Sequence, residues 1–322
     1  MTIQQAKILG KETLNSSPTP ELDTAVLLQH VTGFDKTKLL VNRDYVLTGA
    51  QEKLFTDCLN KRKTGLPVAY ITGIKEFYGW DFCVNPDVLI PKPDTELLVD
   101  NALNALGKAY AALENPDGSL KKIPSVLDMC SGSGCVGISI LKALIENDGI
   151  NVNDLPKLTL ADISIKALET AKTNAERLLG NGEKYSDSKE LLSALYKVRF
   201  VQTNLFDNLP LKFDYIFTNP PYVPHTQAKD LLKDGRSEPL LALDGDISAD
   251  GSWSGTEDGL ALITRLVPEC MEHLEAGGLL IMETGEYNAE ETAGLFRECG
   301  FKDVHIDCDL NGMMRNVSGV RV

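Results

Sequence analysis

The chain has 322 residues, a formal net charge of −14 and 43% hydrophobic residues, which is enough apolar material for a sizeable core and excludes a disordered chain. No stretch approaches the roughly 20 apolar residues that a membrane span needs, and the first residues resemble neither a secretory signal nor a transit peptide. We therefore expect a cytoplasmic protein without a membrane segment.

The seven cysteines are odd in number and contain no C-x-x-C pair, and there are only four histidines. This usage fits reduced thiols better than a disulfide framework, and we expect no metal site. The acidic balance argues against a partner that is held mainly through its phosphates, so we expect no direct nucleic-acid binding.

Residues 1–64 have the pattern of a helical domain, because apolar residues recur at three- and four-residue spacing in IQQAKILGKETL, PELDTAVLLQHVTG and TGAQEKLFTDCLNKRK. Residues 1–85 carry ten basic and nine acidic side chains, a net of +1, whereas the rest of the chain carries 22 basic and 37 acidic, a net of −15. Residues 65–90 change to short β-rich runs broken by Gly, which predicts a hairpin that links the helical domain to a second domain at 91–322.

In the second domain, apolar strands alternate with helical stretches. The strand candidates are PSVLDMC, KLTLADIS, KVRFVQTNLF, FDYIFTNPPY, GGLLIMETGE and KDVHIDCD. This alternation predicts an α/β fold with a mostly parallel sheet, in which ligands bind outside the carboxyl ends of the strands. Three polar segments, 107–123, 180–193 and 244–258, are expected to be surface insertions.

A glycine-rich loop follows the first strand of this domain in VLDMCSGSGCVGIS. Its G-x-G-x-x-G spacing lets the backbone approach a ligand and is shared by several nucleotide-type cofactors. Asp128 precedes the loop, and a carboxylate aimed into it would suit a cationic ligand and repel a pyrophosphate; the same side chain could instead cap a helix or turn. Cys130 and Cys135 are expected to be small buried side chains.

Asp162 ends the next strand, LTLAD, where an acidic group can accept hydrogen bonds from ribose hydroxyls. An adenosine that carries a positive charge describes S-adenosylmethionine. The two carboxylates therefore predict this cofactor rather than a dinucleotide.

The tetrapeptide Asn219-Pro220-Pro221-Tyr222 follows the strand FDYIFT. The Asn219 side-chain carbonyl and the Pro220 backbone carbonyl can each accept one N–H of a planar –NH2 group, and Tyr222 offers a flat face for stacking. The two prolines fix φ twice and hold the acceptors in place. The motif therefore predicts methylation of an amide or an exocyclic amine, by orientation and electrostatic preorganisation.

With these motifs in view, the sequence resembles the HemK/PrmC family of protein-(glutamine-N5) methyltransferases, which modify class-I peptide-chain release factors. The resemblance covers nearly the whole chain and includes AYITG, VLIPKPDTE, VLDMCSGSG, FDYIFTNPPYVP, SEPLLAL, METGE and DLNGMMR. NPPY together with VLIPKPDTE and AYITG is its highly specific part. It implies a Rossmann-like S-adenosylmethionine-dependent methyltransferase sheet with a small N-terminal helical domain that docks the partner. It also implies methyl transfer to N5 of the Gln in a Gly-Gly-Gln motif, with S-adenosylhomocysteine as product, and we expect a monomer.

Carried over to this chain, the resemblance implies that Asn219 to Tyr222 hold the substrate glutamine, that Asp162 holds the ribose, and that Asn204 and Leu205 flank the adenine. Pro93, Thr95 and Glu96 are expected to shape the pocket. Together with the carboxylates above, the full set predicted to bind the cofactor is Asp128, Cys130, Ser131, Gly132, Ser133, Gly134, Asp162, Ile163, Asn204, Leu205 and Asn219.

The chain departs from the family pattern at a few positions. Lys92 stands where the family has Arg, Cys130-Ser131 where it has Gly-Thr, and Asn204 where it has Asp. Lysine keeps the charge but loses the fork geometry, and asparagine can still hydrogen-bond an adenine edge. The segment 244–258 is also longer than the turn usual in the family.

Other functions remain open at this point. Methylation of a ribosomal-protein glutamine would use the same chemistry with different docking surfaces. Adenine-N6 methylation of DNA shares the tetrapeptide, but the net charge of −14 and the lack of an obvious basic base-reading domain speak against it. A dehydrogenase that uses NAD, or a non-catalytic binding module, would leave the intact tetrapeptide unexplained.

Overall fold

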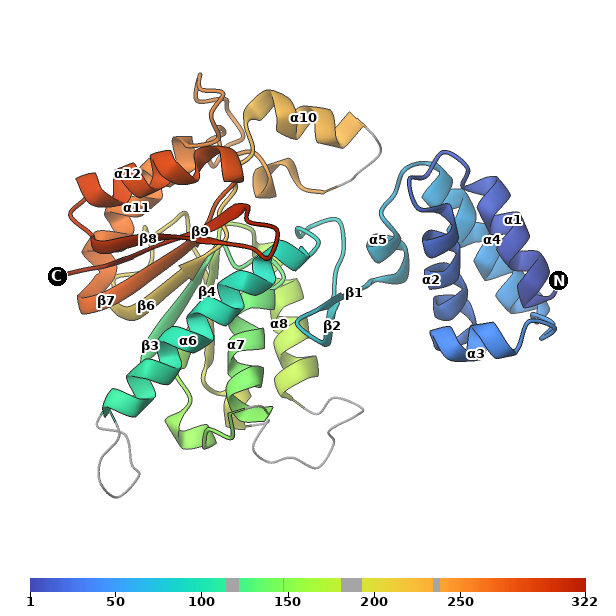
Figure 1. Cartoon of the computed structure of the whole chain (residues 1–322), viewed down its shortest axis with the longest axis horizontal. Coiled ribbons are helices and arrows are strands. Elements are labelled where there is room, and N and C mark those ends of the chain that lie inside the picture. Colours follow the sequence, from blue (N-terminus) through green and yellow to red (C-terminus); the bar gives the residue numbers. More distant parts are fainter. Residues whose placement is uncertain (114–121, 147, 181–192, 234–237) are drawn as a thin grey trace. The chain divides into compact units, whose positions relative to one another are not determined.

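The computed structural model describes residues 1–113, 122–146, 148–180, 193–233 and 238–322. The chain divides into two compact units, residues 1–74 with 230–237 and residues 75–229 with 238–322. Figure 1 shows the helices and strands of each unit. None of the helices in the described residues is both long and apolar enough to cross a membrane.

Residues 1–74 of the first unit form five helices, α1 (Ile3–Thr13), α2 (Pro20–Thr32), α3 (Lys36–Val41), α4 (Gly49–Lys63) and α5 (Val68–Thr72). Capping boxes at Thr2 and Thr48 start α1 and α4. In each, the threonine hydroxyl accepts the backbone N–H of the glutamine three residues later, and the side chain of that glutamine accepts the backbone N–H of the threonine. The apolar faces enclose a core around the fully buried Phe55. Arg62 Nε donates to Asp23 Oδ2 at 2.7 Å and ties α4 to α2.

The segment that follows differs in part from the β-rich pattern expected for residues 65–90. Val68–Thr72 is the helix α5, because Val68 and Ile71 lie one helical turn apart and pack against the core of the first unit. Strands β1 (Ile74–Phe77) and β2 (Trp80–Cys83) form a two-stranded sheet.

The second unit is built on a seven-stranded mixed sheet in the order β5-β4-β3-β6-β7-β9-β8, which confirms the α/β fold class. Its strands are β3 (Ser125–Met129), β4 (Lys157–Asp162), β5 (Val198–Gln202), β6 (Phe213–Thr218), β7 (Leu274–Glu283), β8 (Lys302–Cys308) and β9 (Met314–Val320). Strands β3 to β7 all run parallel to one another, whereas β9 runs antiparallel between β7 and β8.

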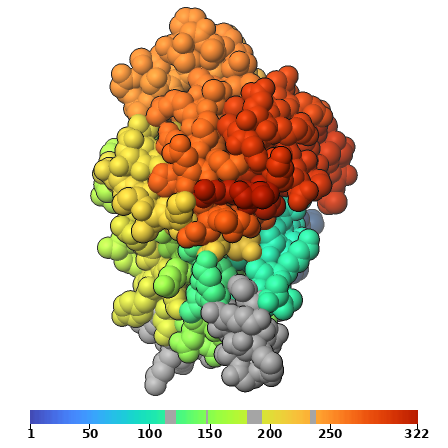
Figure 2. Space-filling view, turned by 90° about the vertical axis from the view of Figure 1, so that its left-hand side faces the viewer, coloured from blue at the N-terminus to red at the C-terminus, as the bar shows by residue number. Residues whose placement is uncertain are grey.

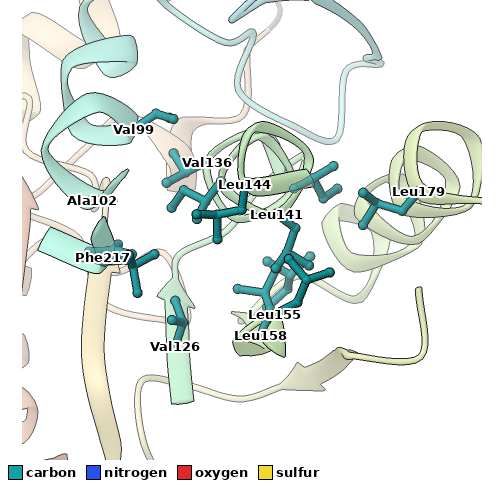
Figure 3. Packing of buried hydrophobic residues seen from close by; sticks show 14 of the residues in the cluster. Val99, Ala102, Val126, Val136, Leu141, Leu144, Leu155, Leu158, Leu179 and Phe217 are labelled. Atoms are coloured by element: carbon teal, nitrogen blue, oxygen red, sulfur yellow. The ribbon is translucent and has the colours of Figure 1, made fainter. Parts of the chain in front are cut away.

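Helices cover both faces of this sheet, as Figure 1 shows. One face carries α6 (Glu96–Leu113), α7 (Cys135–Glu146) and α8 (Ile165–Leu179), and the other carries α11 (Ala261–His273) and α12 (Ala289–Glu298). The remaining elements are η1 (Pro93–Thr95), η2 (Val152–Asp154), α10 (His225–Lys233), η3 (Leu240–Ala242) and η4 (Glu286–Asn288). Figure 3 shows the hydrophobic core between the sheet and the face that carries α6, α7 and α8. In this core, Val126 and Phe217 of the sheet face Val136 of α7 and Ala102 of α6.

Three sequence expectations differ from the structure or fall outside it. Strand β9 was not predicted, because a glycine and a buried asparagine interrupt its apolar pattern; Gly319 is required there, since a Cβ would come within 2.9 Å of the Phe296 ring. Residues 107–113 of the first expected insertion form the end of α6, where Tyr110 is buried. Residues 114–121 and 181–192 of the expected insertions lie outside the described residues.

Asn174 of α8 joins the β-hairpin to the glycine-rich loop. Its fully buried side chain accepts the Cys83 N–H at 2.7 Å and donates to the Cys83 and Ser133 carbonyl oxygens at 3.0 and 2.9 Å. One amide therefore satisfies three backbone groups from two other segments, and buried backbone groups without such partners are costly.

We expect Asn174→Ala to lower the free energy of unfolding by about 2–4 kcal/mol, because it leaves three buried backbone groups without partners. Urea denaturation followed by circular dichroism measures the change. Thr173→Ala is the matched control, since Thr173 is exposed on the same helix and its hydroxyl donates to the carbonyl of Glu169 within that helix. Equal stability of both variants would show that water satisfies these groups.

Candidate active site

The carboxyl ends of the central strands open into a cavity of about 220 Å³. Eight of the predicted site residues line it: Cys130, Gly132, Asp162, Ile163, Asn204, Leu205, Asn219 and Pro221. The other predicted cofactor- and substrate-binding residues are not part of the lining: Asp128 lies in β3, and Ser131, Ser133, Gly134, Pro220 and Tyr222 lie in the same loops as the lining residues. Pro93, Thr95 and Glu96, which were expected to shape the pocket, do not line it either. The strand ends therefore bring the predicted motifs together, as a doubly wound sheet requires.

The glycine-rich loop turns tightly between β3 and α7. Cys130, Gly132 and Gly134 all have positive φ, at 59°, 53° and 76°. A Cβ on Gly132 would meet no atom within 4 Å, whereas one on Gly134 would lie 2.8 Å from Ile138 Cδ1. Gly132 therefore leaves open space on the cavity side, and Gly134 allows the loop to pack on its own helix.

Asp162 fastens this loop to the end of β4. Its Oδ2 accepts the Gly132 N–H at 2.8 Å, and its Oδ1 accepts the Ser164 N–H at 2.9 Å. Burial raises the pKa of the carboxyl, and these backbone donors act in the opposite direction. Each oxygen keeps a lone pair beside the cavity, so the carboxylate is fixed in place and can accept hydroxyl hydrogen bonds from a bound ribose.

Asp128 is buried behind the loop. Its Oδ2 accepts the Gly137 N–H from the first turn of α7 at 2.9 Å. Burial raises the pKa of this carboxyl to about 7, although the Gly137 bond lowers it. Of the two roles considered from the sequence, the geometry gives Asp128 the helix cap; a direct contact with the ligand stays a prediction.

Asn204 and Leu205 follow β5 and also line the cavity. The Asn204 side chain donates to Asp207 Oδ2 at 3.2 Å, which ties it to its own turn. Leu205 has a φ of 50°, and this strained backbone turns the chain past the cavity.

The tetrapeptide Asn219-Pro220-Pro221-Tyr222 leaves β6 beside the cavity. Asn219 Nδ2 donates to Thr95 Oγ1 at 3.1 Å, and the Tyr222 hydroxyl donates to Glu283 Oε1 at 3.0 Å. Tyr287 and Asn288 donate to the Tyr222 carbonyl at 3.2 and 3.1 Å. The motif is thus held by side chains from η1, the end of β7 and η4.

Sequence reasoning did not assign a role to Glu283, although a signal was present. Like Asp128 and Asp162, it is an acidic residue at the end of a buried strand. Burial raises its pKa to about 7, whereas the hydrogen bond from Tyr222, the nearby Thr95 hydroxyl and the charge of Arg315 lower it.

Two segments form the outer wall of the cavity. Asp87, Val88 and Leu89 follow the hairpin, and residues from Pro239 to Ala249 close the other side. Glu238 connects them, because its Oε1 accepts the Ile90 N–H at 3.2 Å and pairs with Lys92 Nζ at 2.7 Å. Lys92 therefore braces the wall and does not line the cavity.

The segment 244–258, expected to be a surface insertion, also contributes to this wall. Ile247, Ser248 and Ala249 line the cavity. Buried Asp246 organises the segment by accepting the Gly259 N–H at 2.9 Å and the Thr256 hydroxyl at 2.8 Å. Its tip does project: residues near 250 form the orange top of the space-filling view in Figure 2.

The charged residues that line the cavity within the described part of the chain are all acidic. Two of them are paired with side chains outside the lining, since Lys166 Nζ lies 3.1 Å from Asp87 Oδ1 and His225 Nδ1 lies 2.6 Å from Asp244 Oδ2. Asp87, Asp162 and Asp244 are its charged lining residues, and within the described part of the chain no Lys or Arg belongs to the lining. Such a cavity favours a cationic ligand and disfavours a pyrophosphate. The residues present therefore fit S-adenosylmethionine better than a dinucleotide.

Comparison with known proteins gives two family-model matches, one near the start of the chain and one in its middle. Residues 5–73 match the family model described as PrmC N-terminal domain, and residues 112–236 match the one described as methyltransferase small domain. A protein of Burkholderia pseudomallei named release factor glutamine methyltransferase is 31% identical over 322 residues, which cover 99% of this chain and 98% of that protein.

A protein of Leptospira interrogans with the same name is 33% identical over 303 residues, covering 93% of this chain and 91% of that protein. Among solved structures, the hMettl16 catalytic domain in complex with a MAT2A 3'UTR hairpin is 14% identical, with a TM-score of 0.49, and the match covers 82% of this chain and 81% of that chain.

We expect Asp162→Ala to weaken binding of S-adenosylmethionine by about 1–3 kcal/mol, because ribose hydroxyls would lose their acceptor and Gly132 its anchor. Isothermal titration calorimetry measures the affinity. Glu169→Ala is the control, since Glu169 is an exposed acidic residue on α8 outside the cavity lining. An unchanged affinity in Asp162→Ala would remove the residue from the site.

Proposed function

Since the chain belongs to the release factor glutamine methyltransferase family, we propose that it methylates N5 of the glutamine in the Gly-Gly-Gln motif of class-I peptide-chain release factors. The observation that carries this proposal is the position of Asn219-Pro220-Pro221-Tyr222 at the carboxyl end of β6, beside an acidic cavity. As part of the proposal, residues 1–64 dock the release factor, and the enzyme works as a cytoplasmic monomer.

The cofactor is S-adenosylmethionine, which supplies an electrophilic methyl group on a sulfonium. Asp162 would hold its ribose, Asn204 and Leu205 would flank its adenine, and the backbone around Gly132 would surround its methionine part. The wall formed by the segments near Val88 and Ile247 would shield a bound cofactor from solvent on that side.

Asn219 and Pro220 would hold the substrate amide. The lone pair of an amide nitrogen is delocalised into the carbonyl, so the nitrogen is a poor nucleophile until its two N–H groups are held by acceptors. The Asn219 side-chain carbonyl and the Pro220 backbone carbonyl can provide these acceptors, and they would also stabilise positive charge that develops on the nitrogen. The amide proton can leave after the methyl group has arrived, so the reaction needs no strong base.

Tyr222 contributes a ring that is fixed in place. Its hydroxyl bond to Glu283 and its carbonyl bonds to Tyr287 and Asn288 hold both ends of the residue. A fixed ring is a suitable stacking face for the planar amide, because little side-chain freedom remains to be lost on binding.

The first test is transfer of a labelled methyl group from S-adenosylmethionine to a purified class-I release factor. A Gln→Ala variant of its Gly-Gly-Gln motif, a ribosomal-protein fraction and a DNA duplex serve as comparisons. Label on the wild-type factor alone supports the proposal. Label on the ribosomal proteins or on the DNA, with none on the factor, would overturn it.

We expect Asn219→Ala to abolish methyl transfer and to leave the affinity for S-adenosylmethionine within several-fold, because the side-chain carbonyl would act on the substrate amide. The transfer assay and calorimetry measure the two quantities separately. Asn153→Ala, an exposed asparagine of η2, should retain full activity. Comparable losses of turnover and cofactor affinity in Asn219→Ala would instead indicate a structural role.

A further inference from the structure

Glu283 lies beside Asn219 on the neighbouring strand. In the parallel pairing of β6 with β7, Thr218 is opposite Met282, so the residues that follow, Asn219 just past the end of β6 and Glu283 at the end of β7, lie at the same level of the sheet. The Glu283 side chain belongs to a residue that is only 1% exposed. A carboxylate buried this deeply has a large desolvation cost unless hydrogen-bond donors replace the water that it has lost.

The donors to this carboxylate come from residues around the tetrapeptide. Oε1 accepts the Tyr222 hydroxyl at 3.0 Å. Oε2 is buried and makes no direct hydrogen bond within the described part of the chain, so it is available to the hydroxyl of Thr95, which lies close enough to lower the pKa of the carboxyl.

Thr95 stands between Glu283 and Asn219. Its side chain is 2% exposed, and its Oγ1 accepts Nδ2 of Asn219 at 3.1 Å. Arg315 of β9 secures the element that carries Thr95, because its guanidinium bonds Asp94 Oδ2 at 3.1 Å and Asp309 Oδ2 at 3.0 Å.

The hydroxyl proton of Thr95 decides which way the amide of Asn219 points. A hydroxyl has one proton to donate, and a carboxylate can only accept. If the proton goes to Glu283, only lone pairs of Oγ1 face Asn219, and Asn219 must present its NH2 to Thr95. Its carbonyl oxygen is then left for the substrate. If the proton went to Asn219 instead, the amide would turn over and present donors to a substrate –NH2, which also carries donors.

We propose that Glu283 is a positioning residue, which acts through the Thr95 hydroxyl to keep the carbonyl oxygen of Asn219 turned toward the substrate amide. This inference rests on the proposed function, because it assumes that the group bound at Asn219 is a donor. It gives a role to a buried acidic side chain that need not touch the substrate or the cofactor.

The kinetic test compares Glu283→Gln, Thr95→Val, Thr95→Ser and the Glu283→Gln/Thr95→Val double variant. Thr95→Val keeps the shape and removes the hydroxyl, whereas Thr95→Ser keeps the hydroxyl. We expect kcat to fall about 10- to 100-fold in Glu283→Gln and Thr95→Val, with KM for the release factor and Kd for S-adenosylmethionine within about threefold. Thr95→Ser should retain kcat within about threefold, and the double variant should lose no more than the worse single variant.

A second measurement does not depend on the substrate. The side-chain NH2 signal of Asn219, assigned by its loss in Asn219→Ala, should exchange slowly with solvent in the wild type and in Thr95→Ser, and faster in Thr95→Val and Glu283→Gln. Wild-type kcat in Thr95→Val, or losses that multiply in the double variant, would overturn the inference. If Glu283→Gln does not fold, the comparison of Thr95→Val with Thr95→Ser still decides it.

Failure of the proposed function would look different. In that case the wild-type enzyme would not methylate the release factor, while the exchange of the Asn219 NH2 group would still report whether Thr95 and Glu283 orient it. If the wild-type enzyme methylates the release factor but the Asn219 NH2 group exchanges at the same rate in all variants, the positioning role of Glu283 is wrong and the proposed function still holds.

Discussion

Three carboxylates at the carboxyl ends of β3, β4 and β7 organise the site, because burial deprives each of water, fully or in part, and hydrogen-bond donors of the protein must replace it. Asp128 takes the N–H of Gly137 and so fixes the start of α7. Asp162 takes the N–H groups of Gly132 and Ser164 and so fixes the glycine-rich loop. Glu283 takes the hydroxyl of Tyr222 and so fixes the tetrapeptide.

The same need for donors explains how the cavity can carry acidic residues without a large loss of folding stability. Its lining carboxylate Asp162 has backbone donors on both oxygens, which compensate part of the burial cost without adding a positive charge to the cavity. An arginine or lysine partner at that place would have neutralised the field that attracts a cationic cofactor. Backbone donors therefore serve the site better than salt bridges would.

Much of this could be predicted from the sequence, because it depends on local pattern. Alternation of apolar runs predicted the strands β3 to β8, and residues at their carboxyl ends, such as Asp162 and Asn219, were expected to share one edge of the sheet. The contact of Thr95 with Asn219 could not be predicted in this way, since it joins residues 124 positions apart and depends on how η1 docks. The folding of segment 244–258 into the wall depends likewise on hydrogen bonds that a local pattern does not reveal, because Asp246 accepts them from Thr256 and Gly259.

The position of β9 has a consequence for the order in which the second unit folds. Strands β8 and β9 are joined by a short turn and can pair as a local hairpin, whereas β7 must wait for β9 to reach it. Until then the edge of β7 that faces away from β6 is unpaired, and the ion pair between Arg315 and Asp94 has not formed. We therefore expect the hairpin to dock late in folding, so that the groups around Asn219 acquire their final arrangement only when β9 pairs with β7.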